Sequence, residues 1–186
     1  MSSRKQKLTI KSDGCRIADF EPLIRVTDGL TLSQVCAITG LEPSTVQNWV
    51  KRGFVARPVE KKYRQRQLAR ILLISSMRDS MKIENIGELM AMVNGSANDE
   101  GDDIIPEERL YDYFCEVIDR AGEHPFETDA ESLIASVISD YTGPGEDAKR
   151  RLSKALSVML SAHICAVYKQ DAENKLKKMR KEYHHG

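Results

Sequence analysis

Residues 32–53 carry the pattern that most restricts the fold of this chain, two short segments of apolar periodicity separated by a glycine and a proline. Gly40 ends the first segment, as a residue able to adopt positive φ does after a helix. Pro43 follows where the first turn of a helix tolerates a missing N–H. Cys36 supplies a small residue where the helices approach, and apolar side chains are expected to lock them together: Val35, Leu41, Val46 and Trp49. The pattern predicts a helix-turn-helix.

The second helix of this motif has a polar outer face. Such a helix, placed in the major groove of DNA, presents its outward side chains to bases and phosphates. The outward residues are Ser44, Thr45, Gln47, Asn48, Lys51 and Arg52. Amide side chains such as Gln47 and Asn48 form bidentate hydrogen bonds with adenine N6 and N7, whereas Lys51 and Arg52 suit phosphates. The alternative explanation is an ordinary solvated face.

Residues 54–63 predict a short two-stranded β ribbon, because apolar residues surround Pro58. Six cations fall within fourteen positions from here onward: Arg57, Lys61, Lys62, Arg64, Arg66 and Arg70. A ribbon beside a recognition helix can place such cations along the DNA backbone, where phosphate neutralisation supplies most non-specific affinity. A solvated run of charges is the alternative.

The net charge of zero conceals a strong segregation along the chain. Residues 1–83 carry +9, residues 84–147 carry −16, and residues 148–186 carry +7. A basic front favours an anionic partner. The same distribution is equally compatible with attraction between the basic front and the acidic middle of the chain.

Two segments, GLEPSTVQNWVKRGFV and KKYRQRQLARILLISSMRDSMKIENIGELM, resemble the winged helix-turn-helix of MerR-type regulators over about a third of the chain. The matching positions are Gly40, Pro43, Thr45, Gly53, Phe54, Val55, Tyr63, Arg64, Leu68 and Ile71. The resemblance implies DNA binding, with Tyr63 and Arg64 at the DNA backbone, usually by a homodimer. Residues 17–167 more closely resemble an uncharacterised bacterial family with this type of domain, in which a segment like LYDYFCEVI (Leu110 to Ile118) also occurs.

Two departures from the MerR-type pattern affect the expected DNA contacts. Gln47 and Asn48 replace the usual Arg-Tyr of the recognition helix, so that no base preference carries over. Lys62 stands where a glycine usually precedes the Tyr-Arg pair, and the ribbon is shorter, which leaves the form of its turn open.

The remaining pattern predicts four regions along the chain. Residues 1–28 form an N-terminal arm, of which Ile17, Phe20, Leu23 and Ile24 are candidates to pack on the next domain. Residues 29–94 form the winged helix-turn-helix, and 95–105 an acidic linker. Residues 106–183 form a C-terminal helical domain for dimerisation or regulation. Its last helix carries an apolar stripe from Leu152 to Val167, which suits a dimer interface or a helix packed within the monomer.

Several classes of function lack support in the sequence. No apolar run approaches the length of a membrane span, and the N-terminus has no signal-peptide core, so we expect a cytoplasmic protein. No P-loop, GxSxG, HExxH or dinucleotide-binding pattern occurs, which argues against an enzyme. The four cysteines and four histidines do not cluster as metal ligands do. We expect no cofactor and no metal.

The sequence therefore predicts an all-α protein with a small β wing, a winged helix-turn-helix of MerR-like type followed by a C-terminal helical domain. The predicted function is transcriptional regulation through double-stranded DNA, with a homodimer on a two-fold-related site. One alternative is a protein-interaction or adaptor module that kept the fold and lost DNA binding. Another is a regulator that senses a small molecule between the C-terminal helices, around Tyr111, Tyr113, Phe114 and Tyr141.

Overall fold

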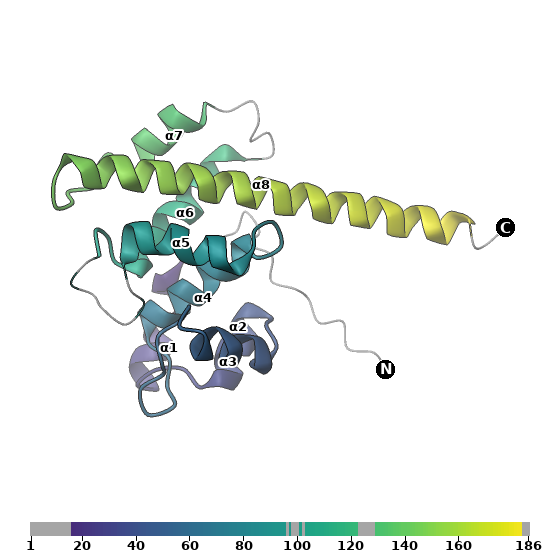
Figure 1. Cartoon of the computed structure of the whole chain (residues 1–186). Coiled ribbons are helices and arrows are strands. Elements are labelled where there is room, and N and C mark those ends of the chain that lie inside the picture. The colour runs from purple at the N-terminus through teal and green to yellow at the C-terminus, as the bar shows by residue number, and fades with distance from the viewer. Residues whose placement is uncertain (1–15, 96, 98–100, 102, 123–128, 184–186) are drawn as a thin grey trace.

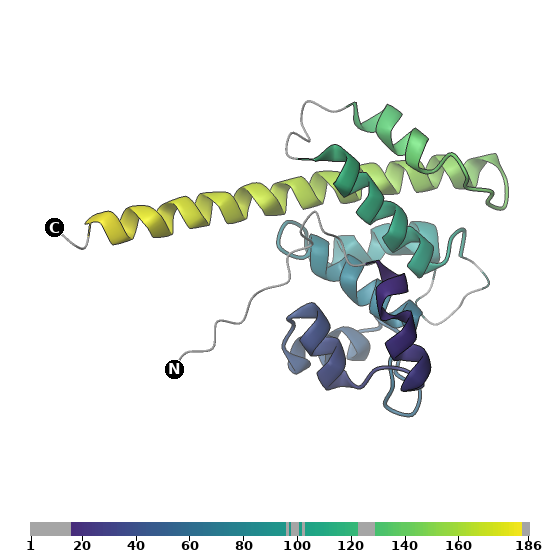
Figure 2. The same ribbon diagram turned by 180° about the vertical axis from the view of Figure 1, so that it is seen from behind.

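The computed structural model describes residues 16–95, 97, 101, 103–122 and 129–183. Over these residues the chain folds into eight helices, as Figure 1 shows. Their bounds are α1 Ile17–Val26, α2 Leu32–Thr39, α3 Pro43–Lys51, α4 Gln65–Met77, α5 Ile83–Asn94, α6 Glu107–Ala121, α7 Ala130–Val137 and α8 Glu146–Tyr183. The predicted all-α class is confirmed. Figures 1 and 2 place α2 and α3 at one end of the molecule and α7 and α8 at the other.

The N-terminal arm is helical rather than irregular from Ile17 onward, and its first 15 residues lie outside the described part of the chain. Ile17 and Ile24 of α1 are buried, whereas Leu23 is exposed. Arg16 anchors the start of α1, because its guanidinium donates to the Asp112 carbonyl at 2.6 Å and pairs with Asp119 at 2.7 Å. The described part of the arm thus belongs to the packed body.

The predicted β ribbon over residues 54–63 does not form as a pair of strands. Within the described residues only two isolated antiparallel bridges occur, Val59 with Lys62 and Leu30 with Tyr63. Pairing stops beyond Val59 because the Arg57 carbonyl accepts a hydrogen bond from the Gln67 side chain at 2.8 Å instead. Tyr63 pairs with Leu30 rather than across the ribbon. The segment is a loop closed by a single hairpin bridge.

The core is organised around α4. Nine of its residues are buried, from Gln67 to Met77, and the helix contacts α1, α2, α5, α6 and α8. A helix that is apolar on nearly every side is stable only when other elements surround it. One connected cluster of buried side chains extends from Ile17 in α1 to Ile164 in α8. The front and the C-terminal part of the chain therefore share a core.

Arg66 and Arg70, two of the six cations expected on an anion-binding surface, lie instead at the interface of α4 with α6. Arg70 is 4% exposed and pairs with Glu107 at 2.9 Å. Arg66 Nε lies 2.8 Å from the other Glu107 oxygen, and Arg66 also pairs with Asp103 at 3.2 Å. The prediction that these two arginines lie on an anion-binding surface is therefore wrong. Their pairs with Glu107 are instead contacts between the basic front and the acidic middle of the chain, the alternative that the sequence left open. The physical reason is that a helix surrounded by protein cannot turn Arg70 to water.

The last helix, α8, divides into two halves. Leu152, Leu156 and Met159 are fully buried, so this part of the predicted apolar stripe packs within the monomer. Beyond Ile164 most side chains are exposed, and Figure 1 shows this half of α8 extending past the body. None of the helices in the described residues has the length and apolar character of a membrane span.

We expect Glu107→Ala to lower the free energy of unfolding by about 3–5 kcal/mol, because it leaves the buried Arg70 and the partly buried Arg66 without their shared carboxylate. Urea denaturation measures the change. The matched control is Glu131→Ala, which removes an exposed acid from the first turn of α7 and should cost no more than about 1 kcal/mol. Similar small losses in both variants would contradict the structural role of Glu107.

Candidate nucleic-acid interface

Local sequence explains where α2 and α3 begin and end. Thr31 caps α2, because its hydroxyl accepts from the Gln34 N–H at 3.3 Å while the Gln34 side chain accepts from the Thr31 N–H at 2.8 Å. Gly40 ends α2 with φ 67° and ψ 11°, a left-handed conformation that costs glycine little. Pro43 begins α3. The predicted boundaries of this helix pair are confirmed.

The two helices are locked as the sequence predicted. Val35 and Val46 are fully buried, and Leu41 and Trp49 are nearly so. Cys36 is half-buried and packs against the same core cluster. Because these apolar groups fix the rotation of α3 about its axis, they also decide which of its side chains face outward.

The outward face of α3 carries most of the predicted contact residues. Exposed side chains on and directly after the helix are Ser44, Gln47, Asn48, Lys51 and Arg52, and Thr45 is half-buried. The structure therefore brings the amide and cationic candidates onto one exposed face. The lysine and arginine lie at its C-terminal end, and the serine and threonine at its start.

Arg52 is held by side chains of α5 and of the following loop. Its guanidinium pairs with Glu84 at 2.6 Å and lies 4.8 Å above the Phe54 ring. The hydrogen bond from Arg52 lowers the pKa of Glu84 below its ordinary value. A methyl group at Gly87 would lie only 2.8 Å from the Phe54 ring, which shows how closely this ring packs on α5. Arg52 is exposed, but its position is fixed.

The hairpin loop after α3 presents two of its predicted cations to solvent. Arg57 and Lys61 are exposed, and within the described residues neither makes an ion pair. Lys62 is half-buried and donates from Nζ to the Thr27 carbonyl at 3.0 Å. Tyr63 is only 3% exposed, and burial raises the pKa of its hydroxyl. Its ring belongs to the core, so we leave Tyr63 out of the contact surface.

Arg64, the last predicted contact, pairs with Asp28 in the turn between α1 and α2. The two terminal guanidinium nitrogens of Arg64 donate to the two Asp28 oxygens, one of them at 3.2 Å. The hydrogen bond from Arg64 lowers the pKa of Asp28, and the same pair raises the pKa of Arg64. Asp28 and Glu84 were not predicted from the sequence, because they lie 36 and 32 residues from the arginines they hold.

Gly29 permits the close approach that holds the hairpin loop against the helix pair. Its φ is +106°, and a Cβ there would lie 2.9 Å from the Lys62 Cβ and 3.2 Å from the Tyr63 carbonyl oxygen. Next to it, Leu30 and Tyr63 exchange two backbone hydrogen bonds of 2.8 Å. The position of the loop relative to α2 and α3 thus depends on a residue without a side chain.

The aromatic residues of the predicted small-molecule site are packed rather than arranged around a cavity. Tyr111, Tyr113 and Phe114 are buried in the core. Tyr113 donates to Asp140 at 2.7 Å, and the half-buried Tyr141 donates to the Ile104 carbonyl at 2.7 Å. Within the described residues no group of three histidine, cysteine or acidic side chains is placed to hold a metal ion.

Comparisons with known proteins match part of the chain. Residues 26–114 match the model of a family described as a domain of unknown function (DUF1836), a stretch that contains the candidate interface and Glu107. The uncharacterized protein YkrK of Bacillus subtilis (strain 168) is 24% identical over 115 residues, which cover 60% of this chain and 49% of that protein. The chain thus matches about half the length of this relative. No solved structure matches the chain.

We expect Gly29→Ala to destabilise the protein by more than Gly53→Ala does. Both glycines have positive φ, which costs an alanine about 1–2 kcal/mol, but a Cβ at Gly53 meets no atom within 4 Å whereas one at Gly29 meets Lys62 and the Tyr63 backbone. The difference in Tm between the two variants measures the cost of the contact between a Cβ at position 29 and the Lys62–Tyr63 segment. Equal losses in both variants would contradict it.

Proposed function

We propose that this protein is a transcriptional regulator that binds double-stranded DNA through the outer face of α3 and the loop at residues 57–61. The observation that carries the proposal is the exposure of Gln47 and Asn48 beside Lys51 on a helix whose opposite side is locked into the core. The resemblance of residues 40–55 and 61–90 to the MerR-type winged helix-turn-helix supports the same assignment.

In this proposal α3 lies in the major groove, and Gln47 and Asn48 read base edges. Both side chains are long enough to form the paired hydrogen bonds that amides make with adenine. Ser44 and Thr45, at the start of the helix, contact either base edges or phosphates. No acidic residue stands between Pro43 and Gly53 in the sequence. The exposed acids Glu84 and Asp28, at the edges of this surface, are already paired with Arg52 and Arg64.

The exposed cations supply the electrostatic part of binding. Lys51, Arg57 and Lys61 make no ion pair within the described residues, so each can neutralise a phosphate without first losing a partner. Arg52 and Arg64 already hold Glu84 and Asp28. When these arginines bind a phosphate they exchange one anionic partner for another, so each adds little to the free energy of DNA binding. Lys62 orders the loop through its bond to Thr27.

We further propose that the protein binds a two-fold-related site as a homodimer. The projecting half of α8 supports this, because it exposes apolar side chains at helical spacing, Leu176, Met179 and Tyr183. A helix that exposes an apolar stripe is stabilised when the apolar face of another helix covers that stripe. A dimer places two copies of α3 on successive turns of the duplex.

The alternative function is a protein-interaction or adaptor module. The same exposed apolar residues of α8 favour it, since they suit a different protein as well as a second copy. An adaptor would bind duplex DNA weakly and without preference for sequence, so that direct measurements of DNA binding separate the two functions.

Lys61→Ala is expected to weaken binding to all duplexes alike and to reduce the slope of log K against log salt by about 0.9, because one phosphate contact is lost. Fluorescence anisotropy across a salt series measures both quantities. Lys149→Ala serves as the control, because it removes an exposed lysine from the first turn of α8. Figure 1 shows α8 at the opposite end of the molecule from α3. If both variants change the slope equally, the loop is not a specific contact.

Selection from random duplex DNA should yield a motif with two-fold symmetry, and Asn48→Ala should change the preferred bases within it. The expected cost at one base position is about 1–3 kcal/mol of discrimination, the usual value of a bidentate contact. Ser33→Ala, an exposed change on α2, is the control and should recover the original motif. Failure to enrich any motif with the wild-type protein would contradict DNA-sequence recognition.

A further inference from the structure

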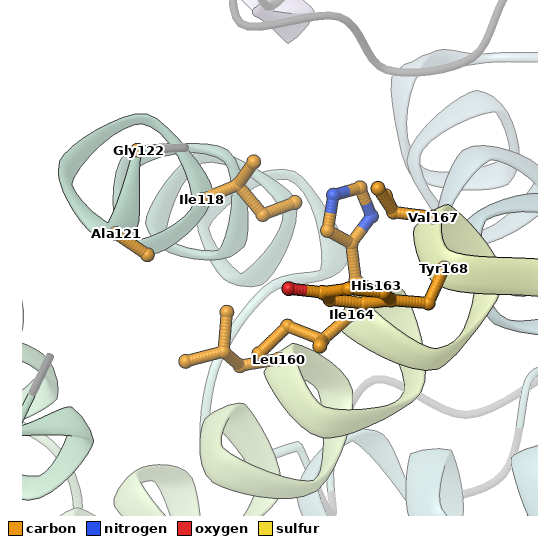
Figure 3. Close-up of a pocket in the computed structure, with 8 residues that line it drawn as sticks. All are labelled: Ile118, Ala121, Gly122, Leu160, His163, Ile164, Val167 and Tyr168. Carbon is orange, nitrogen blue, oxygen red and sulfur yellow. The ribbon is translucent and has the colours of Figure 1, made fainter. Parts of the chain in front are cut away.

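A cavity of about 130 Å³ lies between the C-terminal end of α6 and the middle of α8. Ile118 and Ala121 line it from α6, and Leu160, His163 and Ile164 from α8, with Val167 and Tyr168 at its α8 side as Figure 3 shows. The cavity sits where α8 leaves the body, since Ile164 is 8% exposed and Tyr168 is 50% exposed. It is distinct from the α3 surface, and it adjoins the predicted sensor site through the contact of His163 with Phe114.

The chemistry of the lining disfavours charged ligands. Among the described residues that line the cavity, none is an acid, a lysine or an arginine. The one ionisable base is His163, and burial lowers the pKa of its imidazole below the ordinary 6.5, which favours the neutral ring at pH 7. A charged group placed here would lose its hydration without gaining a partner. The cavity therefore suits a neutral, largely apolar molecule.

His163 and Tyr168 are the two lining side chains with hydrogen-bonding groups, and His163 is the more buried of them. Its ring packs edge-on against Phe114, with centroids 6.1 Å apart and an interplanar angle of 88°, which fixes its orientation. Within the described part of the chain neither ring nitrogen has a hydrogen-bond partner. A neutral imidazole offers one donor and one acceptor. The ring can thus bind a ligand hydroxyl or N–H.

We propose that this cavity binds a small neutral aromatic molecule with one hydrogen-bonding group, of the phenol class, with His163 as its polar contact. The size agrees with this class, because an engineered apolar cavity of about 150 Å³ binds benzene. The ligand would bridge α6 and α8 at the base of the projecting half of α8. The proposal is independent of DNA binding.

Titration of the full chain with phenol, followed by the methyl resonances of the protein, tests the site. Saturable shifts are expected at Ile118, Ile164 and Val167, together with a rise in Tm that grows with phenol concentration. Benzoate, the anionic analogue, should bind at least tenfold more weakly at pH 7.5. No saturable binding of phenol, or shifts confined to other parts of the protein, would overturn the proposal.

Two variants make the test specific. Val167→Trp fills the cavity from its rim and should weaken phenol binding at least tenfold, whereas Val158→Trp, at a similarly exposed site on the same helix outside the cavity, should leave it unchanged. His163→Phe should weaken phenol binding roughly fivefold and leave benzene binding within twofold, as loss of one hydrogen bond requires. Equal phenol affinities in the two tryptophan variants, or an unchanged phenol affinity in His163→Phe, would overturn the assignment.

Discussion

The pairing of Glu107 with Arg70 is the interaction on which the rest of the structure depends. Glu107 stands in the first turn of α6, where the helix dipole favours an acid, and it meets two arginines of the most buried helix. Arg70 also donates from Nε to the Phe54 carbonyl at 2.8 Å. One carboxylate therefore connects the C-terminal helices to α4, and through Arg70 to the loop that follows α3.

This connection divides the basic front of the chain into two populations. Arg66 and Arg70 compensate buried acids and are unavailable to a partner. The exposed cations Lys51, Arg57 and Lys61 lie on α3 and on the hairpin loop, and these elements are at the end of the molecule away from α8 (Figures 1 and 2). The charge segregation seen along the sequence thus serves two purposes in three dimensions, internal pairing and an exposed basic surface. The net charge of a segment does not tell which of its cations are paired inside the protein and which are exposed.

The helix pair could be predicted from sequence because its determinants are local. Gly40 and Pro43 set the turn, and Val46 with Trp49 set the buried side, all within one short segment. Long-range pairs were not predictable in this way, since spacing along the chain carries no information about Asp28 with Arg64. Arg70 is the instructive case. It is the single charged residue in the apolar run from Leu68 to Ile74, and a charge in such a run is almost never buried unless paired.

The division between held and free cations also limits how the proposed DNA contact can work. Arg52 and Arg64 keep fixed positions at the edges of the α3 face because Glu84 and Asp28 hold them. Fixed arginines lose less conformational freedom on binding, but each exchanges one anion for another, and water screens these exposed pairs. The counterion release that drives non-specific binding must then come mainly from Lys51, Arg57 and Lys61. In this arrangement the unpaired cations set the affinity for DNA, whereas Arg52 and Arg64 set the position of α3 along the duplex.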